Sequence, residues 1–395
     1  MRAPSAPIKP AVPPEDGEGI REESARNPRC VIPCIAEGDE IQSSIYLRRY
    51  SMRRLIVPLS LIAMLAAPMM QIPLAAQTES KTLVVYTALP DSELPTYFGE
   101  FQKDTGIKIQ YVRLSAGEVL ARIKAEKGNP QASVWYGGSY DNFVAAAKDG
   151  LLETYQSPEL VNIPKDFHDA SGFANPFYVG AISFACNTEW FKRKGLPYPT
   201  SWDDLLKPEF KEQISMAHPG TSGTSYTILA TIVQMRGEAG AWEYFRALNQ
   251  NVRQYTKSGA APPMDVGLGE AAIGITFSHD GLKPAFEGYP VALSFPKDGT
   301  GFEIGCVALI KGGAAKELAN AKRFIDWTLS KRGQELFEPS KSFRLPVNRL
   351  AKAPGGAVDM NDLKVINYNA VWAGENRKRL VEEFTKTIAA QNNLK

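Results

Sequence analysis

The chain has 395 residues, of which 44% are hydrophobic and 22% are charged, and its formal net charge is +2. This composition is typical of a globular protein that is long enough for two domains. The near balance of charge excludes the strongly basic composition of nucleic-acid-binding domains, so we expect no nucleic acid among the partners.

The first 76 residues are predicted to form a disordered leader and an export signal that precede the folded part. Residues 1–51 are rich in Pro, Glu, Ser and Arg and lack apolar periodicity. From Met52, two arginines precede an apolar run at 55–68 and a small-residue stretch that ends at Ala76, which is the pattern of a cleaved signal peptide. We therefore predict an export signal over 52–76, cleavage near Ala76, Met52 as the true translation start, and a periplasmic mature protein.

Strand and helix patterns alternate from residue 83 onwards. Apolar, β-branched strand patterns are predicted at 83–86, 107–112 and 133–136, and amphipathic helix patterns at 92–105, 118–127 and 140–148. This βαβαβα order predicts a parallel sheet covered by helices. Right-handed crossovers then place the loops that follow these strands, at 87–90, 113–117 and 137–139, along one edge of the sheet.

A second block of the same class follows. Its predicted strands lie at 177–186, 213–217, 272–277, 290–295 and 304–310, and its predicted helices at 226–236, 238–248, 315–330, 334–337 and 376–392. We therefore expect an α/β protein with two lobes linked by two or more strands. Ligands bind in the cleft between such lobes, and hinge closure encloses them.

Two cysteines follow the predicted cleavage point, Cys186 and Cys306, each in an apolar run typical of a strand. Export permits a disulfide, and buried free thiols fit the same pattern. A bridge requires the two strands to be neighbours, which the sequence does not establish, so both alternatives stay open.

A turn rich in glycine and hydroxyl groups, at 218–226, lies between a short strand pattern and a helix pattern. Backbone N–H groups and the positive end of a helix dipole make such a turn a receptor for phosphate, phosphonate or carboxylate. Ser and Thr residues before a helix are more often simple N-caps, so the turn alone does not decide the function.

Seven short segments, taken together and in order, point to a known family. They are LVVYT at 83–87, KAE at 124–126, SVWYGG at 133–138, PTSWDDL at 199–205, PGTSGT at 219–224, GEAAIG at 269–274 and PKDGT at 296–300. With them the chain resembles the extracellular solute-binding proteins of ABC importers, in particular the ferric-binding proteins and their sugar-phosphate- and phosphonate-binding relatives.

The resemblance implies a type II periplasmic binding protein. Each lobe would be a mixed, mostly parallel sheet with covering helices, and hinge strands would join the two lobes. We assign 77–180 and 304–350 to lobe 1, and 181–303 and 351–395 to lobe 2. The partners implied are a small solute and an ABC permease in the inner membrane, and we expect a monomer.

The chain departs from the ferric-binding pattern where iron ligands are expected. Their paired tyrosines lie in the loop after the strand matched by 272–277, and here that loop reads Ser278-His279-Asp280. Their histidine is matched by about Pro90, and their acidic ligand by Gly137-Gly138. Ferric iron prefers phenolate and carboxylate oxygens, so iron is disfavoured.

The remaining pattern suits a polyhydroxylated anion. By resemblance to sugar-phosphate binders, His279, Asp280 and Glu303 would contact ligand hydroxyls, which carboxylates accept well. The other predicted ligand-binding residues come from the strand-end loops and the glycine-rich turns of both lobes: Thr87, Arg113, Ser115, Gly117, Gly138, Ser139, Thr221, Ser222, Gly223, Thr224 and Ser258.

We therefore expect the substrate-binding component of an ABC transporter that captures a sugar phosphate or phosphonate, without a cofactor. Catalytic motifs such as a nucleophile elbow, a zinc-binding helix or a Walker loop are missing from the sequence. Three alternatives remain: ferric iron held through a bound anion, a periplasmic phosphohydrolase that uses His279 and Asp280, and a thiamine-like cation clamped by Trp135 and Tyr136.

Overall fold

A single mixed sheet runs through the part of the chain that the computed structural model describes, residues 80–390. The strands are β1 (Thr82–Thr87), β2 (Lys108–Arg113), β3 (Val134–Ser139), β4 (Leu152–Glu153), β5 (Asn175–Asn187), β6 (Ile214–Ala217), β7 (Val252–Thr256), β8 (Ile273–Phe277), β9 (Val291–Ser294), β10 (Phe302–Ile310) and β11 (Leu345–Pro346). The main order is β2-β1-β3-β10-β5-β8-β6-β7.

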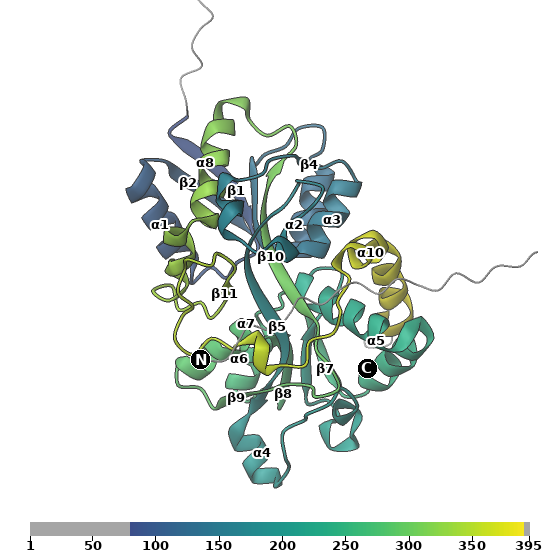
Figure 1. Ribbon diagram of the computed structural model, residues 1–395. Helices are drawn as coiled ribbons and strands as arrows, with labels where there is room; N and C mark the ends of the chain where they lie inside the picture. Colours follow the sequence, from purple (N-terminus) through teal and green to yellow (C-terminus); the bar gives the residue numbers. More distant parts are fainter. Residues whose placement is uncertain (1–79, 391–395) are drawn as a thin grey trace, which may run out of the picture. The chain divides into compact units, whose positions relative to one another are not determined.

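The long strand β5 belongs to both halves of this sheet. Its first half pairs antiparallel with β10, and its second half pairs antiparallel with β8 and β9. On either side of this connection the pairings β1–β2, β1–β3, β6–β7 and β6–β8 are parallel. Figure 1 shows β5 and β10 running between the two groups of helices. The fold is therefore the two-lobed α/β fold of type II periplasmic binding proteins.

Helices cover both faces of the sheet. They are α1 (Leu94–Thr105), α2 (Ala116–Ala125), α3 (Tyr140–Lys148), α4 (Thr188–Lys194), α5 (Gly223–Leu248), α6 (Pro262–Gly267), α7 (Ser278–Phe286), α8 (Leu318–Leu329), α9 (Lys331–Gln334) and α10 (Ala370–Phe384). Among the residues from 80 to 390, none of the helices combines the length and the apolar character needed to cross a membrane.

The buried side chains of each lobe come from separate stretches of the chain. In lobe 1, α1 and α8 cover one face of the sheet and α2 and α3 the other, and the core residues there lie within 83–179 and 304–347. The larger core of lobe 2 is built from residues within 182–277 and 373–388. We propose that the lobes divide at the boundaries predicted from the sequence, because the two cores separate at the same places.

Local chemistry explains why most elements form where the pattern predicts them. In α1, the buried residues Leu94, Tyr97, Phe98 and Phe101 follow helical spacing, and Gly106 ends the helix with a φ of 74°. The two helices predicted at 226–236 and 238–248 are both present within α5. They are joined by a break at Gly237, whose φ is 69° and ψ 168°.

Other elements differ from the sequence prediction. The residues Ser278-His279-Asp280, expected in a loop, form the first turn of α7. The sequence does not indicate this helix, because it contains Gly281 and Pro284 and both residue types disfavour helix interiors. The segment that leads to Ser258 begins as a strand, since β7 extends to Thr256.

The disulfide alternative is wrong for this structure, in which both cysteines are free and buried. Cys306 in β10 lies opposite Pro176 of β5, whereas Cys186 lies near the far end of β5. Ten residues of strand separate these positions, which is about 33 Å and far beyond the ~7 Å limit for bridged Cα atoms.

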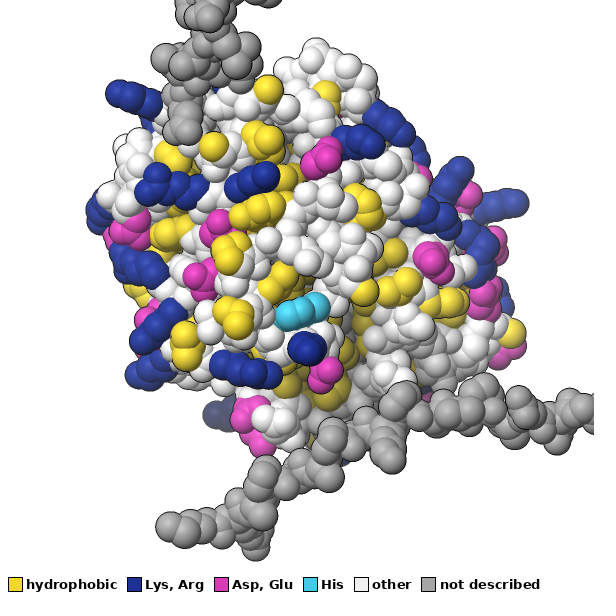
Figure 2. All heavy atoms as spheres, turned by 45° about the horizontal axis from the view of Figure 1, so that its top comes forward, with side chains coloured by type: hydrophobic (Ala, Val, Ile, Leu, Met, Phe, Trp, Pro, Cys, Tyr) yellow, Lys and Arg dark blue, Asp and Glu magenta, His cyan; other side chains and the backbone are white. Residues whose placement is uncertain are grey.

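The leader, the export signal, the cleavage point and the start at Met52 lie outside the described residues. Charged side chains on the face in Figure 2 are spread over the surface, with acidic residues among the basic ones. This distribution agrees with the small net charge of +2.

Candidate ligand-binding site

A polar cavity of about 40 Å³ lies where the strand ends of the two lobes meet. Lobe 1 contributes the predicted residues Arg113, Ser115, Gly138 and Ser139 to its lining, and Glu303 lies at the start of β10, where the two lobes join. The lining from lobe 2 includes the predicted residues Ser222, Gly223, Thr224, Ser258, His279 and Asp280. The space holds only a few water molecules, so a solute of hexose size requires the lobes to separate before it enters.

Three of the helices that begin at this cavity have a serine as their N-cap. Ser115 precedes α2, Ser139 precedes α3 and Ser222 precedes α5, and all three have the extended backbone typical of N-caps. The positive ends of three helix dipoles therefore converge on one space, from both lobes. Such an arrangement favours an anion.

The hydroxyl groups near these helix N-termini differ in whether their proton is free to bind a ligand. Ser115 Oγ is buried and has no hydrogen-bond partner among residues 80–390. Ser222 Oγ accepts from Ser225 N at 3.2 Å, and Ser258 Oγ accepts from Arg113 Nη2 at 3.1 Å, so both serines keep their own proton for a ligand. Ser139 is different, because its Oγ donates to Asp141 Oδ1 at 3.1 Å.

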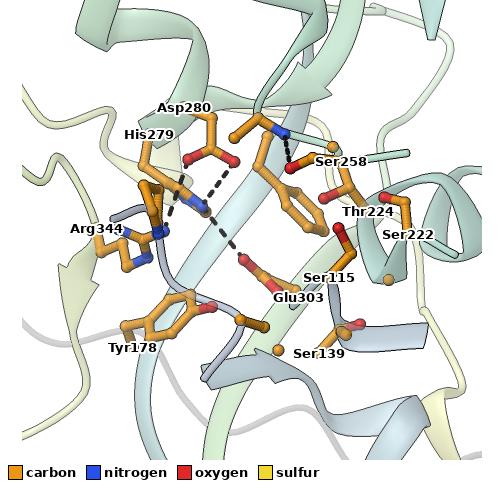
Figure 3. A pocket seen from close by; sticks show the side chains of 18 of the residues that line it. Ser115, Ser139, Tyr178, Ser222, Thr224, Ser258, His279, Asp280, Glu303 and Arg344 are labelled. Atoms are coloured by element: carbon orange, nitrogen blue, oxygen red, sulfur yellow. Dashed lines mark hydrogen bonds and ion pairs between the residues drawn. The ribbon is translucent and has the colours of Figure 1, made fainter. Parts of the chain in front are cut away.

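The opposite end of the cavity carries carboxyl groups arranged around a histidine (Figure 3). His279 Nε2 lies 3.3 Å from Glu303 Oε1 and 3.8 Å from Asp280 Oδ2. Arg344 Nη2 lies 3.6 Å from Asp280 Oδ1, and Arg344 Nη1 donates to Glu93 Oε2 at 2.6 Å. All of these side chains are buried.

Burial sets the protonation of this group. It raises the pKa of Asp280 to about 6, against the opposing effect of Arg344, and raises the pKa of Glu303 well above its usual value. Burial and then the Arg344 charge hold the pKa of His279 well below its usual value. The imidazole is therefore neutral, and we assign its proton to Nε2, which faces the two carboxyl groups.

The backbone of β5 fixes the other side of that imidazole. His279 Nδ1 has no hydrogen-bond partner and lies against Gly180, where a Cβ atom would overlap the ring. Glycine at 180 is thus required for the close approach of His279 to the strand. Nε2 faces Glu303 and Asp280, so the imidazole is placed to orient these two carboxyl groups.

Three of the predicted ligand-binding residues do not line the cavity: Thr87, Gly117 and Thr221. Thr87 is fully buried, and its Oγ1 accepts from Leu89 N at 3.2 Å, which shapes the loop after β1. Gly117 N donates to Thr221 O at 2.9 Å. These two residues therefore join the lobes beside the cavity.

Sequence reasoning missed several residues that line the cavity, namely Ala88, Pro90, Ala116, Tyr178, Gly259, Ala260, Phe277 and Arg344. Arg344 is the most important, because it is the buried cation beside Asp280. Its signal in the sequence is a single arginine in the apolar stretch at 343–347, which is too weak to identify a site.

The aromatic clamp considered for a thiamine-like cation does not form. Trp135 and Tyr136 are both buried, stack on Phe143 and Phe177, and do not line the cavity. In the described part of the chain, no group of three or more His, Cys, Asp and Glu side chains has an arrangement that fits a metal ion.

A family model described as bacterial extracellular solute-binding protein matches residues 139–371. The chain belongs to this family. An uncharacterized protein of Haemophilus influenzae is 38% identical over 78% of this chain and 90% of its own length. The periplasmic binding protein AfuA from Actinobacillus pleuropneumoniae, with fructose 6-phosphate bound, is 37% identical with a TM-score of 0.76, over 78% of this chain and 99% of AfuA.

A Fe(3+)-binding periplasmic protein of Serratia marcescens is 24% identical over 85% of this chain and 99% of its own length. The predicted family is thus confirmed, with sugar-phosphate-binding and ferric-binding relatives. Its members are periplasmic binding proteins and not enzymes, so the phosphohydrolase alternative is wrong. This protein is the periplasmic solute-binding component of an ABC transporter and delivers a small solute to a permease.

Proposed function

We propose that the solute is a small organophosphate-type anion, a sugar phosphate or a phosphonate, held between the lobes. The observation that carries this proposal is the convergence of three serine-capped helix N-termini on one cavity. Their backbone N–H groups and dipoles match a tetrahedral dianion better than a neutral solute or a cation.

The free hydroxyl protons of Ser115, Ser222 and Ser258 complete the anion-binding end. Arg113 adds a positive charge there, and its contact with Ser258 links β2 of lobe 1 to lobe 2. Hydrogen bonds from neutral donors and an arginine to a phosphate are strong because one partner is charged.

The carboxyl end suits the rest of a sugar phosphate. Asp280 and Glu303 accept hydrogen bonds from hydroxyl groups, and Arg344 and His279 hold them in place. The bound fructose 6-phosphate named for AfuA supports the same class of ligand.

Binding assays on the mature protein, residues 77–395, test this proposal. Fructose 6-phosphate, 2-aminoethylphosphonate, inorganic phosphate and ferric citrate are each titrated by calorimetry and by thermal unfolding. We expect at least one organophosphate to raise the melting temperature and to bind with one-to-one stoichiometry. Stoichiometric iron with a visible charge-transfer band, and no effect of any organophosphate, would support ferric iron instead.

A further inference from the structure

A buried carboxylate lies behind the anion-binding end of the cavity without lining it. Asp141, in the first turn of α3, is only 1% exposed. It accepts three hydrogen bonds from side-chain hydroxyls: from Ser139 Oγ at 3.1 Å, from Thr227 Oγ1 at 3.1 Å and from Tyr368 Oη at 3.0 Å. The last two share Asp141 Oδ2.

Both donors to Oδ2 come from the other lobe. Thr227 lies on α5, one turn after its pocket-lining first residues. Tyr368 follows a short connection at 364–366, which is hydrogen-bonded to Thr300 next to β10, and it packs against the core of lobe 2. Asp141 therefore joins lobe 1 to lobe 2 through two hydrogen bonds to a charged acceptor, which are stronger than neutral ones.

Helix α10, which follows Tyr368, adds to the contact between the two lobes. α10 is part of the lobe 2 core through Leu380 and Phe384. Its Gly374 lies so close to Val144 and to the Asp141 carbonyl of α3 that a Cβ atom would overlap them. Closing the lobes thus brings α3 directly against α10.

A buried arginine on α10 ties this contact to the anion-binding turn. Arg377 is 5% exposed, its Nη1 donates to Pro219 O at 3.2 Å, and its guanidinium lies 4.5 Å from the ring centre of Tyr226. The turn that Arg377 holds also accepts the hydrogen bond from Gly117 N through Thr221 O. The N-terminal ends of α2, α3 and α5 are therefore fixed relative to one another in the closed form.

We propose that Asp141 is a positioning residue that locks the closed lobes and sets the affinity for the solute without touching it. When the lobes separate, Asp141 loses the hydrogen bonds from Thr227 and Tyr368. The lock therefore slows opening and solute release, while association, which begins from the open form, stays the same. The choice of solute in the test rests on the proposed function, but the lock itself does not.

The test combines two conservative substitutions, Thr227→Val and Tyr368→Phe, which remove the two donors and keep the shape of the side chains. Thr328→Val is the matched control, because Thr328 on α8 is equally buried and its Oγ1 has no hydrogen-bond partner. In stopped-flow measurements with fructose 6-phosphate, we expect the double variant to release the sugar phosphate about tenfold faster or more. Its association rate and that of the control should stay at the wild-type value.

A second measurement needs no solute. Spin labels at Arg323→Cys on α8 and Lys192→Cys on α4 report the distance between the lobes; both positions are exposed, whereas the native Cys186 and Cys306 are buried and do not label. We expect the double variant, and separately Gly374→Ala, to shift the distance distribution of the ligand-free protein toward longer values. If the distance distributions of the variants equal those of wild type and Thr328→Val, the lock is overturned, whether or not fructose 6-phosphate binds. If wild type binds no organophosphate, the proposed solute is overturned instead.

Discussion

Single residues in the cavity have separable roles, and Ser222 shows this most clearly. It caps α5 through Ser225 N and also offers its proton to the cavity. Ser330 caps α9 in the same way, through Gly333 N, but does not line the cavity. The two serines therefore allow the effect of losing an N-cap alone to be compared with the effect of losing an N-cap together with a ligand contact.

We predict that Ser222→Ala and Ser330→Ala each lower the free energy of unfolding by about 1 kcal/mol, the usual cost of losing an N-cap. Only Ser222→Ala should also weaken binding of fructose 6-phosphate, by about tenfold, because it removes a donor to a charged acceptor. Calorimetric titration and urea unfolding of both variants measure the two effects. Equal affinities would show that Ser222 is only a cap.

The close approach of His279 to β5 gives a second prediction. Gly180→Ala adds a methyl group where the imidazole lies, so we expect it to displace His279 and to abolish detectable sugar-phosphate binding. Gly99→Ala on α1 is the control, because a Cβ atom there meets no neighbour within 4 Å and alanine favours a helix by up to about 1 kcal/mol. Unchanged binding in Gly180→Ala would remove His279 from the site.

The ionisation of Asp280 predicts a pH dependence. Burial raises its pKa in the folded protein to about 6, above the usual value of an aspartate, so the folded state binds this proton more tightly than the unfolded state. The ionised carboxylate of Asp280 therefore lowers the free energy of unfolding above about pH 6. This destabilisation is relieved as the pH falls from about 6 to 4. Binding has the opposite dependence, because ligand hydroxyls need the ionised carboxylate.

We accordingly expect the affinity for fructose 6-phosphate to fall as the pH drops below about 6. The phosphate itself also titrates near this pH, so the same titrations are made with Asp280→Asn, which keeps the phosphate and removes the titration of residue 280. The difference between the two pH profiles isolates Asp280. Parallel profiles would contradict the assignment of Asp280 to the site.

At the scale of the elements, the sequence predicts those whose signals are local. The strands and helices from β1 to α3 follow clear periodicity, and Gly106 and Gly237 mark a helix end and a break where the backbone adopts positive φ. The helix α7 was missed because Gly281 and Pro284 oppose its local propensity, and tertiary packing overrides them. For the same reason Asp280 was identified as a candidate residue but placed in a loop.

The break in α5 gives a prediction at this scale. Gly237 has a φ of 69°, which costs other residues about 1–3 kcal/mol. Gly237→Ala should therefore lower the free energy of unfolding by at least about 1 kcal/mol, whereas Gly240→Ala, three residues later in the regular helix, should not destabilise the protein. Thermal or urea unfolding compares the two. Equal stability would mean that α5 straightens without cost.

Residues that lie at the site only because of tertiary contacts could not be predicted from one sequence. Arg344 follows β10 by more than thirty residues and meets Asp280 only because β11 returns to β5. The hydroxyl donors to Asp141 come from segments separated by up to 227 residues. Neither cluster has a sequence motif, because its members share no periodicity or spacing.

At the scale of the whole molecule, the end of the cavity that we propose binds the anion is built from both lobes. Ser115 and Ser139 belong to helices of lobe 1 and Ser222 to a helix of lobe 2, so an anion between them draws the lobes together. We therefore expect solute binding to favour the closed form of the two lobes.

Calorimetric titration of the mature protein with fructose 6-phosphate and with ferric citrate is the most direct test of the central claim. The account predicts one-to-one binding of the sugar phosphate, lost in Asp280→Ala, and no specific uptake of iron. Stoichiometric binding of iron, with no heat from fructose 6-phosphate, 2-aminoethylphosphonate or inorganic phosphate, would contradict it.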